Sequence, residues 1–189
     1  MVTPTFLIDT TFLFYRTNNA FVGAEILKRG DKDVTFAYGF MRDALRLRQK
    51  LHIQRGILVI GKDAYRVAPE YKITLTVELL TQVGLPLLHE PTMRALDIAN
   101  SLSPQTTHII THNKGFLQLA TDLVHVVLPK GFDDYVAVSG DTVKSYLGVT
   151  DVPTFLTLIR AAGVTKRQAI RLVELYGNLD QLYESKYFN

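Results

Sequence analysis

The stretch Gly56-Ile57-Leu58-Val59-Ile60 is an uninterrupted apolar run, and Gly61-Lys62-Asp63 follows it. A short run without polar alternation, bounded by glycine, is typical of a strand that is covered on both faces. A second run, Thr5 to Ile8, ends at Asp9. Both segments are therefore predicted to be central strands of a parallel sheet.

Strand and helix patterns alternate on both sides of these runs. The segment Thr35 to Leu51 has apolar residues at helical spacing and basic residues on another face, which predicts a crossover helix. Further strands are predicted at Leu85 to Leu88, His108 to Thr111 and Val124 to Leu128, and further helices at Thr76 to Val83, Thr92 to Leu102 and Phe116 to Ala120. This alternation predicts an α/β fold in which a mostly parallel sheet is flanked by helices.

The pattern changes at Ser139, after which only helices are predicted. They cover Ser139 to Leu147, Val152 to Ala161, Thr165 to Tyr176 and Leu179 to Glu184. We therefore expect an α/β domain at residues 1–138 and a helical region at residues 139–189 that packs on it. The segment Gly23 to Asp33 is expected to be a surface loop.

The composition narrows the class of protein. The chain has 189 residues, a formal charge of +3 and no cysteine, which excludes disulfides and thiolate metal sites. No apolar run of about 18 residues lacks charges, so a membrane span is not expected. No nucleotide-binding glycine loop or hydrolase serine motif is present. These features fit a cytoplasmic, nucleoid-associated protein, and the excess of basic residues is compatible with nucleic acid.

Several short motifs, taken in their order along the chain, resemble the 5'-nuclease superfamily. This superfamily has a PIN-like fold and includes flap endonucleases, phage 5'-exonucleases and the 5'-nuclease domain of bacterial DNA polymerase I. The matching segments are Asp9 with Tyr15-Arg16, Tyr38-Gly39-Phe40, Gly61-Lys62-Asp63, Arg66 with Pro69-Glu70-Tyr71-Lys72, Leu96-Asp97-Ile98-Ala99 and Thr111 to Gln118. The compact length suggests a phage or another mobile element as the source.

The resemblance implies a cluster of carboxylates that holds two Mg²⁺ ions. Asp9, Asp63 and Asp97 stand at acidic positions of the family, whereas Asn113 and Gly115 stand at two positions where the family has aspartates. Three carboxylates could hold one weakly bound Mg²⁺, because this ion keeps most of its waters and needs few protein ligands. They are too few to hold two such ions. The expected cofactor is therefore none or one Mg²⁺, and no residue is assigned a catalytic role.

Other roles are open for the same residues. Asp9 precedes a predicted helix and fits a helix cap, Asp63 fits an ordinary turn, and Asp97 fits an exposed helix position. Arg94 and Lys114 would oppose a cation near the site and suit a phosphate. His112 lies beside the family's metal cluster, and we interpret it as a solvated residue at a strand end.

The C-terminal helices resemble the second half of the family's helix-hairpin-helix, a motif that holds a DNA phosphate at a tight turn. Thr165 replaces a glycine of that motif, and the loop that precedes it in the family is deleted between Arg160 and Gly163. The predicted DNA contacts are Gly163, Thr165, Lys166, Arg167 and Arg171, to which the resemblance adds Arg16 and Lys72. A solvated helix face balanced by Glu174 and Glu184 is the alternative.

Three functions follow as hypotheses. The first is a catalytically degenerate relative of the flap endonucleases that binds duplex or branched DNA, independently of sequence, in replication or repair. The second is an active Mg²⁺-dependent 5'-3' exonuclease or flap endonuclease with a reduced site. The third is a module that docks a polymerase or another replisome protein through Phe132 to Val138 or through Tyr183, Tyr187 and Phe188. Threading of a single strand is not expected, because Ile73-Thr74-Leu75-Thr76 runs straight into a helix where the family has an arch.

Overall fold

The central feature of the fold is a six-stranded sheet with the order β5-β4-β1-β6-β7-β8. The computed structural model of the chain describes residues 5–20, 26–130, 134–161 and 164–185. Its main strands are β1 (Thr5–Asp9), β4 (Arg55–Gly61), β5 (Leu87–Glu90), β6 (His108–Ile110), β7 (His125–Lys130) and β8 (Asp134–Val138). All neighbouring strands are parallel except β8, which is antiparallel to β7. The predicted α/β fold with a mostly parallel sheet is confirmed.

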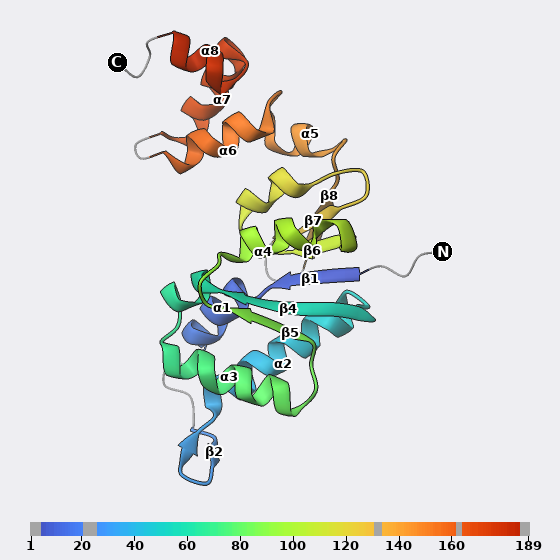
Figure 1. Ribbon diagram of the computed structural model, residues 1–189, viewed down its shortest axis with the longest axis vertical. Coiled ribbons are helices and arrows are strands. Elements are labelled where there is room, and N and C mark those ends of the chain that lie inside the picture. The colour runs from blue at the N-terminus through green and yellow to red at the C-terminus, as the bar shows by residue number, and fades with distance from the viewer. Residues whose placement is uncertain (1–4, 21–25, 131–133, 162–163, 186–189) are drawn as a thin grey trace.

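Helices cover both faces of the sheet (Figure 1). The α-helices are α1 (Thr11–Ala20), α2 (Thr35–Lys50), α3 (Glu70–Gln82), α4 (Ala95–Leu102), α5 (Val143–Leu147), α6 (Val152–Arg160), α7 (Lys166–Tyr176) and α8 (Leu179–Glu184). Three short 3-10 helices are η1 (Lys62–Arg66), η2 (Ser103–Gln105) and η3 (Lys114–Leu119). None of the described helices is long and apolar enough to cross a lipid bilayer.

Side chains along the strands alternate between two buried clusters. Leu7 of β1 belongs to a cluster with α4, η3 and the C-terminal helices, whereas Ile8 belongs to a cluster with α1, α2 and α3. Ile109 and Ile110 of β6 divide in the same way. This division follows from the two-residue period of a strand, and it explains why strands buried on both faces read as continuous apolar runs.

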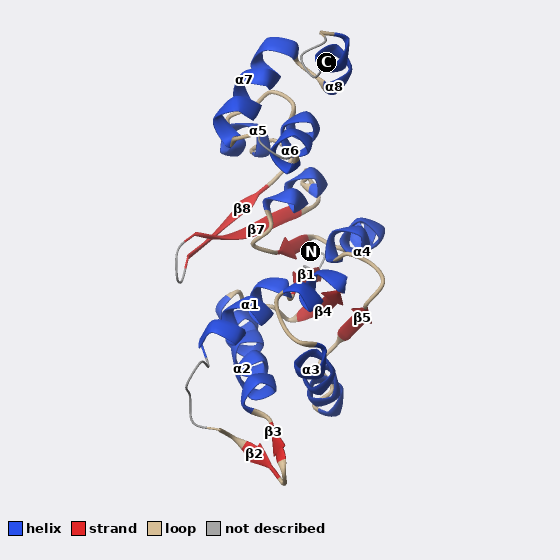
Figure 2. Cartoon of the chain, turned by 90° about the vertical axis from the view of Figure 1, so that its left-hand side faces the viewer, coloured by secondary structure: helices blue, strands red, loops and turns tan. Residues whose placement is uncertain are grey.

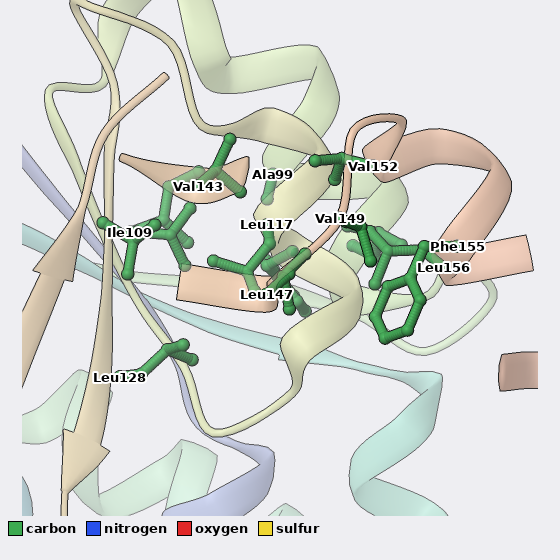
Figure 3. Close-up of a cluster of buried hydrophobic side chains, with 14 of the residues drawn as sticks. Ala99, Ile109, Leu117, Leu128, Val143, Leu147, Val149, Val152, Phe155 and Leu156 are labelled. Atoms are coloured by element: carbon green, nitrogen blue, oxygen red, sulfur yellow. The ribbon is translucent and has the colours of Figure 1, made fainter. Parts of the chain in front are cut away.

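The C-terminal helices share the first of these clusters with the sheet. Figure 3 shows Leu117 of η3 beside Leu147 of α5, with Phe155 and Leu156 of α6 nearby. All four side chains are at most 3% exposed. Among the helices that begin after Ser139, α6 packs on η3, α5 and α7 pack on α6, and all four helices contribute side chains to one buried cluster.

Four predicted elements need correction. Within the expected loop at Gly23 to Asp33, the described residues form a hairpin of β2 (Lys28–Arg29) and β3 (Lys32–Asp33), turning at Gly30, whose φ is +60°. The helix expected from Thr76 begins at Glu70: Glu70 and Tyr71 are exposed and give no apolar signal, although Ile73 in the same turn is fully buried. The segment expected as a helix from Phe116 is the 3-10 helix η3. Asp134–Val138, which the sequence suggests only as part of a docking surface, is a strand paired with β7.

Candidate functional site

A cleft of about 360 Å³ lies at the carboxyl ends of β1, β4 and β6, which are neighbours in the sheet. Ligands of open α/β sheets bind at this edge, where the loops after adjacent strands meet. The cleft is lined by Asp9, Thr11, Asp63, Arg66, Val67, His112, Asn113, Lys114 and Phe116. The cleft therefore brings together Asp9 and Asp63, which are two of the three predicted metal ligands. It also contains Asn113, one of the two positions where the resemblance implies a lost aspartate.

Asp9 is 2% exposed, and hydrogen bonds hold both oxygens of its carboxylate. Oδ1 accepts a hydrogen bond from the backbone N–H of Thr11 at 3.0 Å, and Oδ2 accepts one from the hydroxyl of Thr111 at 2.6 Å. The first contact satisfies a free amide at the start of α1, so Asp9 does act as a cap. Each oxygen keeps a lone pair that can face the cleft.

Asp63 joins η1 to the start of α4. Its Oδ2 accepts a hydrogen bond from the backbone N–H of Ala95 at 3.1 Å. The chain approaches closely here, because a Cβ at Gly61 would lie 2.6 Å from the nitrogen of Ala95. Glycine at position 61 thus lets β4 end against α4 and places Asp63 at the wall of the cleft.

Asp97 pairs with an arginine of its own helix turn. Its carboxylate is exposed and makes a two-pronged pair with Arg94, with both N–O distances at 2.8 Å. The hydrogen bond from Arg94 holds the pKa of Asp97 below its usual value. Asp97 lines a separate cavity of about 430 Å³, to which Gln118 and Arg160 also contribute.

Asp97 is not among the residues that line the cleft with Asp9 and Asp63. Arg94 stands three residues before Asp97 and pairs with it across the first turn of α4. Among the described residues, no group of three or more histidines and carboxylates is arranged to hold a metal ion.

Asn113 and Gly115 form the first turn of η3. The side-chain oxygen of Asn113 accepts a hydrogen bond from the N–H of Gly115 at 2.9 Å, so its carbonyl caps η3. A Cβ at Gly115 would lie 2.5 Å from Nη2 of Arg160. Arg160 is the last residue of α6. Its guanidinium therefore occupies the space where the Cβ of a side chain at position 115 would lie.

Arg160 is a residue that the sequence did not single out. It is 45 positions away from Gly115, and only the packing of α6 on η3 brings the two together. In the sequence, the only feature that could have pointed to Arg160 is its position at the start of the Arg160 to Gly163 segment, where the resemblance implies that a loop of the family is missing. Arg66 and Lys114 line the cleft, whereas Arg160 lines the separate cavity of Asp97 and holds its guanidinium beside Gly115.

The histidines occupy different surroundings. His112 lines the cleft, and its ring centroid lies 6.0 Å from that of Phe12. His89 forms a hydrogen bond with the hydroxyl of Tyr65 at 2.9 Å. His108 lies at the amino end of β6, where its ring stacks on Phe6 and meets the edge of His125. It is therefore at the edge of the sheet opposite the cleft.

The stability of the fold is expected to fall as the pH drops below about 6.5. Burial, and then the charge of His125, hold the pKa of His108 below its ordinary value. His108 in the folded chain then takes up a proton less readily than in the unfolded chain. Its contribution to the stability of the fold is therefore fully present above the unfolded pKa and is lost as the pH falls. Urea unfolding at pH 7.5 and at pH 5.5 measures the difference in the free energy of unfolding between the two pH values. This difference should be smaller in His108→Gln. An equal pH dependence in both proteins would contradict this assignment.

The predicted basic residues of α7 lie on its exposed side. Lys166, Arg167 and Arg171 are exposed, while Leu172 and Val173 are buried against the rest of the protein. The N-cap Thr165 and Gln168 form a capping box, in which the hydroxyl of Thr165 accepts from the N–H of Gln168 at 3.3 Å. Gly163 lies outside the described residues.

The cap changes what the start of α7 offers to a ligand. One of the free amides is already bound by Thr165, so fewer amides point outward than at an uncapped helix. The side chains of Lys166 and Arg167 are left as the main basic groups at this end. A phosphate contact here would therefore depend on their charge.

Arg16 and Lys72 lie on the opposite face of the sheet from α7. Nε of Arg16 is 3.6 Å from Oδ2 of Asp43. Nζ of Lys72 donates a hydrogen bond to Asn18 at 3.0 Å and lies 4.8 Å from the ring centroid of Phe36. Lys72 belongs to α3, and only three residues separate the end of η1 from the start of α3. No extended segment is inserted between η1 and α3.

Comparison with known proteins gives consistent sequence matches. No family model matches the chain. It is 26% identical over 214 residues to DNA polymerase I of Mycobacterium tuberculosis, covering 95% of this chain and 24% of the polymerase. It is 22% identical to the 5'-3' exonuclease of Buchnera aphidicola, covering 96% of this chain and 74% of the exonuclease. The chain thus spans about a quarter of the polymerase relative. At least 25 aligned positions of that polymerase have no counterpart here, since the chain has 189 residues.

Solved structures share the fold. The catalytic core of Rad2 in complex with DNA substrate superposes with a TM-score of 0.66 at 19% identity, covering 98% of this chain and 67% of that chain. The T5 D15 protein co-crystallised with metal ions superposes with a TM-score of 0.63 at 13% identity, covering 96% of this chain and 79% of that chain. Both matches extend through the sheet and the C-terminal helices.

Proposed function

We propose that this chain, which belongs to the 5'-3' exonuclease and flap endonuclease superfamily, is a non-cleaving member that binds duplex or branched DNA in replication or repair. The observation that carries the proposal is the contact of Arg160 with Gly115. A cation of the protein itself stands beside a position where the family has an aspartate.

The chemistry of the cleft supports the absence of cleavage. Two-metal phosphodiester cleavage needs several carboxylates around ions that lie roughly 3.5–4 Å apart. The cleft offers Asp9 and Asp63, each of which already accepts hydrogen bonds from the protein. Positive side chains nearby raise the cost of adding a cation. The residues present do not fit a pair of metal ions, and a single weakly bound Mg²⁺ is the most that they would hold.

The proposed DNA contacts are sequence-independent. Lys166, Arg167 and Arg171 present positive charge on the exposed side of α7, where they would meet backbone phosphates rather than base edges. The Rad2 core, which shares this fold, is a complex with DNA substrate. Gly163, Arg16 and Lys72 complete the proposed set of contacts.

The deciding experiment combines cleavage and binding on one substrate. A labelled 5'-flap duplex is incubated with Mg²⁺ or Mn²⁺, and its binding is measured in parallel at low salt. We expect binding without a cleavage product, and Asp9→Asn should leave both results unchanged. A product that requires both the metal and Asp9 would contradict the proposal.

One observation favours an active enzyme as the second candidate. Asp9 and Asp63 line the same cleft as Asn113, whose carbonyl oxygen is a neutral oxygen donor. A reduced Mg²⁺ site at this place would make the chain a 5'-3' exonuclease or flap endonuclease. The loss of cleavage in Asp9→Asn distinguishes it from a contaminating nuclease.

An exposed aromatic side chain favours the third candidate, a replisome interaction module. Tyr183 of α8 is 68% exposed. Tyr187, Phe188, Phe132 and Asp133 lie outside the described residues, and Asp134–Val138 is held in the sheet as β8. Absence of DNA binding even at low salt would favour this candidate, because phosphate contacts strengthen as salt falls.

A further inference from the structure

A small basic pocket lies between α1, α2 and β8, outside the cleft and on the opposite face of the sheet from α7. Its volume is about 190 Å³. Figure 2 shows the β7–β8 hairpin extending toward the side of α1 and α2. The side chains of the pocket that carry the argument are Phe12, Arg16, Asp43, Arg46, Lys50 and Tyr135.

The buried carboxylate of Asp43 pairs with Arg16, which lines this pocket, and with Arg42, which does not. The side chain of Asp43 is 2% exposed, and its Oδ1 accepts hydrogen bonds from Nε and Nη2 of Arg42 at 3.1 and 2.9 Å. Nε of Arg16 approaches Oδ2 at 3.6 Å. A buried charge is tolerated only when it is paired, so Asp43 fixes the two guanidinium groups against the surface of the helices. Arg46 and Lys50 also line the pocket and are basic.

The chemistry of the pocket suits one phosphate group of a nucleic-acid strand. Guanidinium groups match the oxygens of a phosphate, and groups that are already ordered lose less entropy on binding. Aromatic rings next to basic side chains are typical of surfaces that hold a strand by its bases and its backbone. Phe12 and Tyr135 provide such rings, and Nζ of Lys50 lies 5.8 Å from the ring centroid of Tyr135.

The pocket is also a neighbour of the cleft. Phe12 lines the pocket, and its ring is 6.0 Å from that of His112, which lines the cleft. We infer that the pocket between α1 and α2 binds a backbone phosphate of a DNA strand that runs past the cleft. This inference rests on the proposed function, and it adds a second contact surface that α7 does not provide.

A matched pair of variants on one helix tests the inference. Arg46 lines the pocket, whereas Arg48 stands two residues later on α2 and does not. Arg46→Gln and Arg48→Gln remove the same charge. Binding of a labelled 5'-flap DNA to the full chain at low salt should weaken roughly five- to tenfold in Arg46→Gln and less than about twofold in Arg48→Gln. The salt slope should also fall by about one in Arg46→Gln.

Asp43→Asn separates an organised site from general attraction by charge. The substitution raises the net positive charge, so general attraction predicts tighter binding, whereas loss of the carboxylate that orders Arg16 predicts weaker binding. We expect weaker binding, with a thermal unfolding curve recorded to show that the variant is folded. If Asp43→Asn is not folded, the comparison of Arg46→Gln with Arg48→Gln alone tests the site.

The possible failures are distinguishable. Wild-type binding that Arg46→Gln and Arg48→Gln change equally would overturn this site and leave the proposed function intact. Tighter binding by folded Asp43→Asn would also overturn it. Wild-type protein that binds no DNA at low salt would overturn both the site and the proposed function.

Discussion

Reversing the charge of Lys166 and Arg167 to glutamate is expected to weaken binding of duplex DNA roughly 10- to 100-fold at about 50 mM salt. Both side chains are exposed at the start of α7, where the capping box leaves side-chain charge as the main attraction. The loss should be similar for unrelated sequences, since backbone phosphates carry no sequence information. Fluorescence anisotropy over a series of salt concentrations measures both the affinity and the salt slope, which should decrease.

The control is a double reversal of equal charge at a distant surface. Lys28 and Lys32 are exposed in the β2–β3 hairpin, which lies at the opposite end of the molecule from α7 (Figure 1). Lys28→Glu with Lys32→Glu should weaken binding much less. Equal weakening by the two double variants would mean that only net charge matters, and α7 would then have no special role.

Replacing Phe155 by alanine is expected to lower the free energy of unfolding by about 3–5 kcal/mol, the largest stability effect that we expect. Phe155 is 1% exposed and lies in the buried cluster where α6 meets η3. Alanine leaves a cavity at this contact and removes support for Arg160 at the end of the same helix. Urea unfolding monitored by circular dichroism gives the change.

Leu175→Ala is the matched control for this prediction. Leu175 lies on α7 and is 64% exposed, so its truncation should change the free energy of unfolding by less than about 0.5 kcal/mol. A loss of less than about 1 kcal/mol in Phe155→Ala would indicate that the junction of α6 and η3 is not tightly packed.

The sheet could be predicted because its strands are buried on both faces. Leu58, Val59 and Ile60 give an apolar run that no helix period explains. Exposed elements could not be predicted in this way, because their residues show no apolar pattern. Glu70 and Tyr71 at the start of α3 are exposed, and the strands of the β2–β3 hairpin consist of exposed charged residues, so neither segment shows an apolar pattern.

The cleft could be predicted only in part. Asp9 and Asp63 follow adjacent parallel strands, and the carboxyl ends of such strands meet at one edge. The contact of Arg160 with Gly115 depends on how α6 packs, which no local pattern encodes. The pairing of Asp97 with Arg94 was also missed, although its spacing of three residues on a helix is a recognisable signal.

The single buried cluster that runs from Leu7 of β1 to Leu182 of α8 constrains how this protein can come apart. Because the terminal helices and the sheet bury the same apolar surface, a break in the chain near residue 138 would expose that surface on both fragments. We expect heat to melt the chain in one calorimetric transition, with the inner amides of α7 exchanging their hydrogens on the same timescale as those of β1. If α7 binds DNA as proposed, a force applied through that DNA would act on the whole folded unit.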